Sequence, residues 1–195
     1  MRRCSLLDKT AVLLVDVQRD FCGGGALAVP EGDAVVPVCN ELIGLAAEQG
    51  WPVMASRDWH PAAHCSFAAQ GGPWPVHCVA KTPGAEFHPE LELPVDAMIF
   101  DKGTKNEADA YSAFDGTPAA SVLHDAGIER LVVCGLATDY CVKATVLDAL
   151  KEGFAVAVVK EGCRAVNVAP DDGEKALAEM VTAGATVCEL DDLKG

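Results

Sequence analysis

The chain has 195 residues, of which half are hydrophobic, and a formal net charge of −14. A chain of this length can bury roughly 70 % of its unfolded surface without disulfides or metal, so we expect one domain over residues 1–195. Its acidic composition argues against nucleic acid or an anionic membrane as the main partner, because both bind basic surfaces. The sequence shows no secretory leader and no apolar run of membrane-spanning length, which predicts a cytoplasmic protein.

Six short apolar runs recur along the chain and predict β-strands. They cover 11–15, 52–56, 97–100, 131–135 and 155–159, with a weaker run at 185–190. Because the runs are continuous rather than alternating, both faces of each strand should be covered. Apolar residues at helical spacing predict helices at 33–49 with Asp33 as the cap, at 118–126, from 138 or 139 to 150, and at 171–183. This alternation predicts an α/β fold with a mostly parallel sheet.

Residues capable of chemistry follow four of these runs. In chain order they are Asp16, then Asp58 with His60, then Lys102, and then Cys141. In a parallel α/β sheet the carboxyl ends of the strands share one edge, and ligands bind in the crevice beyond it. The sequence therefore predicts that these side chains converge on one site.

The nine cysteines form no recognisable disulfide or zinc pattern. Their number is odd, and no two have the C-x-x-C spacing of thiolate zinc and redox sites. We therefore expect most of them to be small buried side chains.

Cys141 differs from the other cysteines because a helix is expected to begin near it. If Thr138 is the N-cap, Cys141 is the third helical residue, and the free N–H groups and the helix dipole favour its thiolate form. Cys134 lies inside the preceding strand, where burial should leave the thiol unreactive. The alternatives are that Cys141 is an ordinary core cysteine, or that Cys134 and Cys141 form a redox pair.

Asp16 and Lys102 are suited to assist a nucleophilic thiol. Attack on an amide requires a group that takes the thiol proton and later gives it to the departing nitrogen, and Asp16 is the candidate. Lys102 would hold this carboxylate and add positive charge that favours the thiolate. Taken singly, each has a simpler interpretation, a turn residue for Asp16 and a solvated charge for Lys102.

Asp58 and His60 are candidate metal ligands. Because they are spaced two apart on an extended segment, their side chains point the same way, and His64 or His77 can supply a third ligand. One carboxylate with two imidazoles is a frequent catalytic site for Zn²⁺, Fe²⁺ or Mn²⁺. Structural roles are expected for the other two histidines, His88 and His124.

Several common motifs are missing, which narrows the class of enzyme. The chain lacks the phosphate-binding G-x-x-x-x-G-K-[ST] and a dinucleotide-binding G-x-G-x-x-G after the first strand. It also lacks the G-x-S-x-G and H-E-x-x-H signatures of hydrolases. Nucleotide binding and serine hydrolysis therefore have no sequence support.

Five stretches taken together resemble the isochorismatase-like cysteine hydrolases, and within them the nicotinamidases. They are DVQRDFCGGGALAV, SRDWHPAAHCSF, GGPWPVHCVAKTPGAEFHP, DKGTKNEADAYSAF and GLATDYCVKAT, in the order and spacing of the family. The resemblance covers nearly the whole chain and implies a three-layer α/β/α fold with a six-stranded sheet.

The resemblance also implies an activity, the hydrolysis of nicotinamide to nicotinate and ammonia in NAD salvage, with pyrazinamide as a second substrate. It implies one divalent cation, zinc first, with iron or manganese as alternatives. The nearest alternative activity is that of a related amidase acting on an N-carbamoyl or ureido substrate. A binding protein that keeps the fold without activity is an alternative of another class. The expected partner is a small-molecule amide, and a homo-oligomer is compatible with the sequence.

The resemblance assigns roles to individual residues. It implies a catalytic triad, a set of metal ligands and a set of substrate-binding residues. The triad is Asp16, Lys102 and Cys141, the ligands are Asp58, His60 and His77 with His64 beside the metal, and the substrate residues are Phe21, Trp74, Tyr111 and Ala137. A cis peptide bond is implied before Ala137, so that the N–H groups of Ala137 and Cys141 bind the substrate oxygen. Many nicotinamidases have Asn in place of Arg19, and we expect Arg19 to face solvent.

Overall fold

The computed structural model describes residues 9–194, and it confirms the predicted α/β fold. Six parallel strands form one sheet in the order β3-β2-β1-β4-β5-β6. They are β1 (Thr10–Val15), β2 (Val53–Asp58), β3 (Met98–Lys102), β4 (Arg130–Leu136), β5 (Ala155–Arg164) and β6 (Thr186–Cys188). Each strand overlaps an apolar run predicted above. The central strands are buried on both faces by two layers of helices, whereas the edge strands β3 and β6 keep exposed positions.

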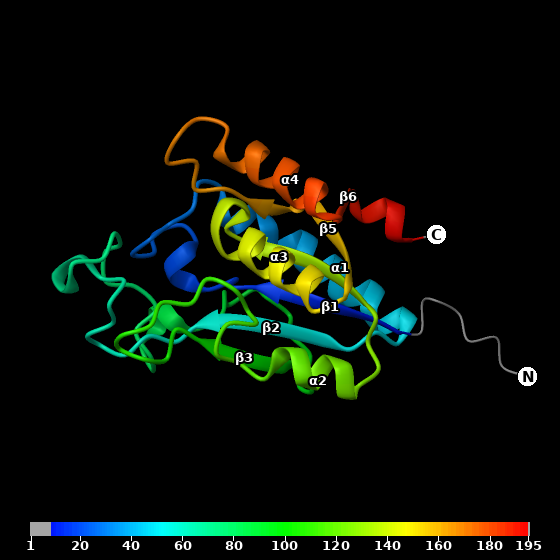
Figure 1. The fold of residues 1–195 in the computed structure, drawn as a ribbon, viewed down its shortest axis with the longest axis horizontal. Helices are drawn as coiled ribbons and strands as arrows, with labels where there is room; N and C mark the ends of the chain where they lie inside the picture. Colours follow the sequence, from blue (N-terminus) through cyan, green and yellow to red (C-terminus); the bar gives the residue numbers. More distant parts are fainter. Residues whose placement is uncertain (1–8, 195) are drawn as a thin grey trace, which may run out of the picture.

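The helices form a layer on each face of this sheet. They are α1 (Val35–Gln49), α2 (Ala119–Asp125), α3 (Lys143–Lys151) and α4 (Asp172–Ala183). The chain moves outward from β1 through β2 to β3 on one side, and from β4 through β5 to β6 on the other. Because crossovers between parallel strands are right-handed, this reversal places α1 on one face and α3 with α4 on the other. The resulting three layers can be followed in Figure 1.

The same reversal creates a crevice between β1 and β4. These strands are neighbours, with Thr10 beside Arg130 at one end and Val15 beside Gly135 at the other. They approach so closely that a Cβ on Gly135 would lie 2.1 Å from the carbonyl oxygen of Val15. In open α/β sheets, ligands bind at such a switch point, beyond the carboxyl ends of the strands.

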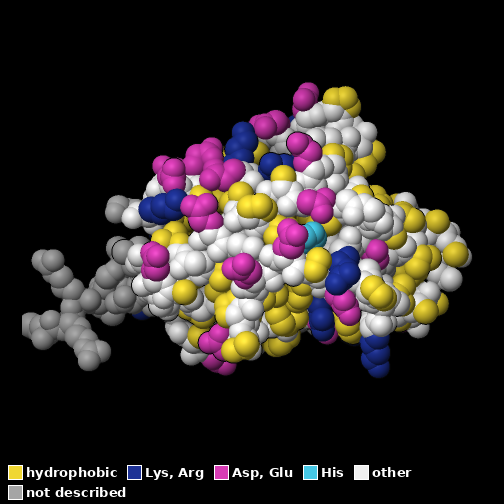
Figure 2. Space-filling view, turned by 180° about the vertical axis from the view of Figure 1, so that it is seen from behind, with side chains coloured by type: hydrophobic (Ala, Val, Ile, Leu, Met, Phe, Trp, Pro, Cys, Tyr) yellow, Lys and Arg dark blue, Asp and Glu magenta, His cyan; other side chains and the backbone are white. Residues whose placement is uncertain are grey.

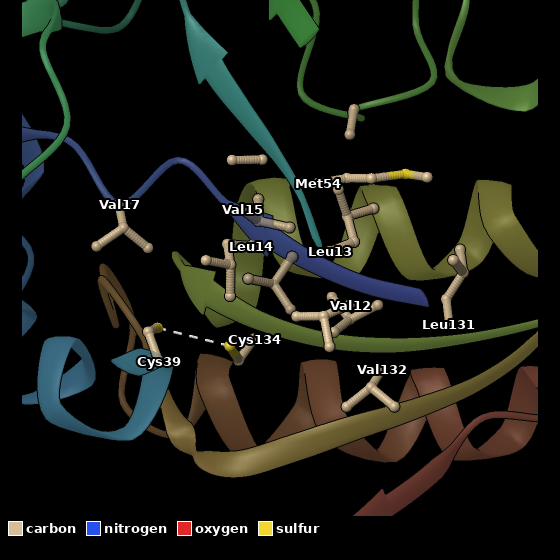
Figure 3. Packing of buried hydrophobic residues seen from close by; sticks show 14 of the residues in the cluster. Val12, Leu13, Leu14, Val15, Val17, Cys39, Met54, Leu131, Val132 and Cys134 are labelled. Atoms are coloured by element: carbon tan, nitrogen blue, oxygen red, sulfur yellow. Dashed lines mark hydrogen bonds between the residues drawn. The ribbon is translucent and has the colours of Figure 1, made fainter. Parts of the chain in front are cut away.

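The centre of the sheet is the hydrophobic core. All six residues of β1 are buried, and Figure 3 shows side chains of this strand within the cluster. Complete burial of each large aliphatic side chain there contributes about 1.5–3 kcal/mol. Sγ of Cys39 on α1 lies 3.5 Å from Sγ of Cys134 on β4, and neither side chain is exposed (Figure 3). Cys134 is therefore a packed core residue, as its place in the apolar run predicted.

The start of α1 differs from the prediction. The helix begins at Val35 after a 3₁₀ turn over Gly32–Ala34, and no side chain caps it. The carboxylate of Asp33 instead accepts a hydrogen bond from the N–H of Gly23 at 2.7 Å. The predicted cap was wrong because a loop distant in sequence takes the carboxylate that the helix would have used.

Acidic side chains are spread over the surface. Figure 2 shows Asp and Glu on much of the face turned away in Figure 1, with Lys and Arg between them. Arg19 is exposed and lies 3.6 Å from the carboxylate of Glu86, which confirms that it faces solvent. Within residues 9–194, no helix combines the length and apolar character needed to cross a membrane.

Candidate active site

Four of the predicted residues converge at the carboxyl edge of the sheet. Asp16 directly follows β1, and Cys141 lies in the turn after β4. Asp58 and Lys102 are the last residues of β2 and β3 and are partners in the strand register. All four are buried, Asp16 completely. The parallel sheet thus gathers side chains that are far apart in the sequence.

The ammonium group of Lys102 is the centre of this cluster. Its Nζ lies 2.9 Å from Oδ2 of Asp16 and 2.5 Å from Oδ1 of Asp58, and it donates a hydrogen bond to the carbonyl of Ala110. It also lies 3.4 Å from Sγ of Cys141. Burial disfavours the charged amine, but the two carboxylates outweigh it and hold the pKa of Lys102 well above its usual range. Lys102 is therefore a cation that joins both carboxylates to the sulfur.

Asp16 is held so that one carboxylate oxygen stays available. Oδ1 accepts a hydrogen bond from the hydroxyl of Ser56 at 2.7 Å. Oδ2 forms the ion pair with Lys102 but accepts no hydrogen bond of acceptable geometry from the described residues. Burial raises the pKa of Asp16, and the charge of Lys102 offsets this only in part. Such a carboxylate, beside a thiol, is suited to act as a general base.

Cys141 lies at the predicted place but in a different state of protonation. The chain after β4 forms a π-helical turn over Thr138–Val142 with Ala137 as the N-cap, so Cys141 is its fourth residue and Thr138 caps nothing. Burial raises the pKa of Cys141, the ammonium of Lys102 lowers it, and the result is a pKa well above the usual value. The expected thiolate is therefore corrected to a thiol, because burial outweighs the helix terminus.

The backbone between β4 and Cys141 departs from regular helix geometry. The peptide bond between Leu136 and Ala137 is cis, at the position that the family resemblance implied. The N–H groups of Tyr140 and Val142 both donate to the carbonyl of Ala137 at 3.1 Å. Among the described residues, the intervening N–H of Cys141 makes no such bond to Ala137. The N–H of Cys141 thus lies between two N–H groups that share the carbonyl of Ala137.

Asp58, His60 and His77 form a compact set of metal-binding side chains. One donor atom from each lies within 4.8 Å of the others. Oδ2 of Asp58 is 3.3 Å from Nε2 of His60 and 3.8 Å from Nε2 of His77. Nδ1 of His60 lies 2.9 Å from the carbonyl of Gly103, and Nδ1 of His77 lies 2.8 Å from that of Pro75. A ring that donates through Nδ1 presents the lone pair of Nε2, so these three residues fit a divalent cation.

Asp58 belongs to both groups of side chains. Its Oδ1 faces Lys102, and its Oδ2 faces the two imidazoles. Burial opposes ionisation of Asp58, but the charge of Lys102 holds its pKa well below the usual range. Asp58 is therefore a carboxylate that connects the candidate metal ligands to the cluster around Lys102.

His64 supports this set from one side. Its ring stacks on that of His60, with centroids 4.0 Å apart. Nδ1 lies 2.7 Å from the hydroxyl of Ser66, and Nε2 lies 3.1 Å from the carbonyl of Ala108. Both ring nitrogens thus have partners within the protein, which agrees with a place beside the cation rather than on it.

An apolar pocket leads to Cys141. The aromatic residues implied by the resemblance, Phe21, Trp74 and Tyr111, all line it, and Nε1 of Trp74 donates to the hydroxyl of Tyr111 at 3.0 Å. The remaining lining residues are Leu27, Val29, Asp58, His77, Leu136, Ala137, Tyr140 and Val166. The pocket is thus lined mainly by aromatic and aliphatic side chains, together with Cys141 and two of the candidate metal ligands, Asp58 and His77.

Sequence reasoning missed three residues that shape the site. The ring of Tyr140 meets that of Trp74 edge-on, with centroids 5.1 Å apart, at the wall of the pocket. The amide of buried Gln18 bonds to both the N–H and the carbonyl of Asp58. Ser56 holds Asp16, as described above. Ser56 could have been found, since it stands two residues before Asp58 on the same face of β2.

The fold and this buried cluster of side chains are those of an α/β hydrolase. A family model described as "Isochorismatase domain" matches residues 10–192. The chain therefore belongs to the isochorismatase family.

Within this family, the chain is similar to proteins named as nicotinamidases. It is 48% identical to "Nicotinamidase" from Escherichia coli over 93% of this chain and 95% of that one. It is 39% identical to "Nicotinamidase/pyrazinamidase" from Mycobacterium tuberculosis over 89% of this chain and 95% of that one. The structure of pyrazinamidase from Pyrococcus horikoshii in complex with zinc matches with a TM-score of 0.90 at 48% identity, covering 93% of this chain and 99% of that one. The resemblance drawn from the five stretches is confirmed.

Proposed function

We propose that the protein is an amidohydrolase that converts nicotinamide to nicotinate and ammonia, and pyrazinamide to pyrazinoate. The observation that carries the proposal is the meeting of Asp16, Lys102 and Cys141 at the end of an aromatic pocket beside Asp58, His60 and His77. The similarity to nicotinamidases and a pyrazinamidase supports the choice of substrate. The physiological role that follows is NAD salvage.

The pocket holds the flat ring, and the polar residues at its end orient the amide. Phe21, Trp74 and Tyr111 contact the faces and edges of the pyridine ring of the substrate. Aromatic side chains suit this role because they lose little conformational entropy on binding. Asp58, His60 and His77 would hold a divalent cation, which supplies a Lewis acid for the ring nitrogen. The carboxamide carbon then rests against Sγ of Cys141.

In the first step Cys141 forms a thioester. Oδ2 of Asp16 takes the thiol proton as the sulfur attacks the carboxamide carbon. The N–H groups of Ala137 and Cys141 bind the oxyanion that develops on the carboxamide oxygen. Lys102 keeps Asp16 ionised and in place. Asp16 then gives the proton to the amide nitrogen, and the C–N bond breaks to release ammonia.

In the second step water replaces ammonia. Asp16, again a carboxylate, takes a proton from the water as it attacks the thioester carbon. The same two N–H groups bind the oxyanion, the C–S bond breaks, and the proton returns to the sulfur of Cys141. Nicotinate leaves and the resting thiol is restored.

Release of ammonia from nicotinamide by the purified, reduced protein is the direct test. We expect turnover of nicotinamide and pyrazinamide, its loss after prolonged chelation, and its recovery when zinc is returned. Absence of ammonia from fresh enzyme supplied with zinc, iron or manganese in turn would overturn the proposal.

The alternatives drawn from the sequence are less well supported. An amidase for N-carbamoyl or ureido substrates does not explain the orientation of His60 and His77 around Asp58. A redox pair of Cys134 and Cys141 is disfavoured, because Sγ of Cys134 faces Cys39 on α1. A protein without activity has no reason to keep Lys102 buried between two carboxylates, an arrangement that is costly to assemble.

Other properties belong to the same proposal. Zinc is the proposed cation, since the similar pyrazinamidase structure is a zinc complex, and iron and manganese are the alternatives. We place the protein in the cytoplasm as one domain over residues 1–195. Its partner is a small amide rather than nucleic acid or membrane, and association into a homo-oligomer is compatible with the site.

A further inference from the structure

A second group of metal-binding side chains lies outside the active site. Cys22, Asp33 and His88 each offer one donor atom, and these atoms lie within 4.8 Å of one another. They come from three stretches of chain, the loop after β1, the turn before α1, and the segment that precedes β3. All three line an open surface groove together with Gly23 and Pro83. An ion can therefore reach them without entering the substrate pocket.

We propose that Cys22, Asp33 and His88 form a second site for a divalent cation of the zinc class. A thiolate, a carboxylate and an imidazole are all zinc ligands, and three protein ligands leave a fourth position for water. The thiolate gives this site a different metal preference from that of Asp58, His60 and His77, because sulfur favours zinc and cadmium over magnesium or manganese. The proposal does not depend on the reaction that the enzyme catalyses.

The backbone holds His88 in position for this role. Its N–H donates to the carbonyl of Val17, and the N–H of Arg19 donates to the carbonyl of Glu86, both at 2.9 Å. Gln18 and Phe87 form an antiparallel bridge between these bonds. The segment that carries His88 is therefore fixed to the chain that leaves β1 and leads to Cys22.

Asp33 is also oriented before any ion binds. Its Oδ2 accepts the hydrogen bond from the N–H of Gly23, and its Oδ1 lies 3.3 Å from Nε2 of His88. A Cβ on Gly23 would lie 2.8 Å from Oδ2, so glycine is what lets the carboxylate approach Cys22. This hydrogen bond ties Asp33 to the residue next to Cys22 and directs its other oxygen toward His88.

Binding requires two changes in protonation. In the present structure Nδ1 of His88 accepts a hydrogen bond from the N–H of Glu90 at 3.2 Å, so the ring proton is on Nε2 and faces Asp33. A cation on Nε2 shifts that proton to Nδ1, and it displaces the proton of the Cys22 thiol. The N–H of Glu90 is on an exposed residue and can bond to water instead. Without a cation, the neutral imidazole of His88 contacts the carboxylate of Asp33 beside the buried thiol of Cys22.

Occupancy of this site has a structural consequence. Cys22 directly follows Phe21, and the loop between Cys22 and Asp33 carries Leu27 and Val29, three residues that line the substrate pocket. A cation bound by Cys22 and Asp33, at the two ends of this loop, and by His88 would link the loop that lines the pocket to the segment that precedes β3. We therefore expect a second equivalent of zinc to raise the thermal midpoint of the protein.

Titration of the metal-free Cys141→Ser protein with Co²⁺ tests the proposal. This background removes the thiol beside the first site, so that a sulfur-to-cobalt charge-transfer band in the near ultraviolet reports Cys22. We expect two equivalents of bound cobalt and the band in this background. We expect Cys22→Ser, added to it, to lose one equivalent and the band. Cys188→Ser, which removes a half-buried thiol on β6, is the matched control and should lose neither.

Two results would overturn the second site. One is a single equivalent of cobalt in the Cys141→Ser background, and the other is a charge-transfer band that survives Cys22→Ser. If Cys22→Ser does not fold, Asp33→Asn and His88→Gln take its place, and each should lose the same equivalent. A failure of nicotinamide hydrolysis would leave these expectations unchanged.

Discussion

Cys141 and Cys134 are both buried thiols with a raised pKa, yet the structure gives them different neighbours. Cys134 contacts Cys39 in the core, and the contact with that second sulfur, together with burial, keeps its proton in place. Cys141 contacts the ammonium of Lys102 and opens onto the pocket. In the proposed mechanism, the reactivity of Cys141 is therefore set by a base, a cation and access to substrate, and not by the resting charge of the sulfur.

The largest expected effect on turnover comes from replacing Cys141, and it distinguishes this residue from Cys134. Cys141→Ala should lower nicotinamide turnover by about 10⁴-fold or more, because no other group can form the thioester. Its thermal midpoint should stay close to that of the wild type. Ammonia release and calorimetry measure the two quantities. Turnover at the wild-type rate in this variant would refute the role assigned to Cys141.

Replacement of Lys102 should reduce turnover nearly as much as replacement of Cys141. Lys102→Met keeps the length of the side chain but leaves Asp16 and Asp58 as buried carboxylates without a counter-charge. We expect turnover to fall by about 10³-fold and the free energy of unfolding to drop by about 3–5 kcal/mol. Urea denaturation checks the second number. A variant of unchanged stability would mean that the two carboxylates do not depend on Lys102.

The pH dependence of kcat/KM follows from the two raised pKa values. Asp16 acts as a carboxylate, and its pKa is raised, so activity should be lost at a higher pH on acidification than for an ordinary Asp. Below that pKa the rate should fall about tenfold per pH unit. Burial raises the pKa of Cys141 well above its usual range, so no rise due to thiolate formation is expected between pH 7 and about pH 9. A rate that climbs tenfold per unit in that range would contradict the resting thiol.

Ser56 tests how Asp16 is held. The hydrogen bond from Ser56 to Oδ1 of Asp16 lowers the pKa of that carboxylate. Ser56→Ala removes this hydrogen bond and should therefore raise the pKa of Asp16. We expect kcat to fall about tenfold with KM little changed, and the acidic limb of the profile to move to higher pH. Ser56→Thr, which keeps the hydroxyl, is the control and should restore both. Equal losses in the two variants would point to packing rather than to the hydrogen bond.

The smallest effect on activity is expected at Cys134. Cys134→Ala should leave turnover close to that of the wild type, because Cys134 is not among the residues that line the pocket. It should lower the free energy of unfolding by about 1–3 kcal/mol, since a small cavity forms beside Cys39. Paired assays of ammonia release and urea denaturation give both values. A large loss of turnover would remove the distinction between the two cysteines.

The sequence predicted most of the fold and the place of the site, for physical reasons. Strands covered on both faces leave continuous apolar runs, so the runs at 11–15 and 131–135 could be assigned directly. Because the ends of parallel strands share one edge of the sheet, the order of the runs was enough to predict that Asp16, Lys102 and Cys141 meet. Both signals are local in the sequence.

What the sequence could not predict depends on contacts between distant segments. Asp33 has the pattern of a helix cap, but Gly23 takes its carboxylate. Thr138 has the same pattern, but the chain enters a π-helical turn in which Ala137 is the N-cap. The protonation of Cys141 follows from burial by segments that no local pattern connects to it.

The position of Asp58 between the two groups of side chains has a consequence for interpreting genetic data. A replacement at this residue removes a candidate metal ligand and, at the same time, a counter-charge of Lys102. A defective Asp58 variant therefore cannot be assigned to loss of the ion or to disturbance of the nucleophile. His60, which is not among the residues that line the pocket and makes no hydrogen bond with Lys102 among the described interactions, is the position at which a screen can isolate the contribution of the metal.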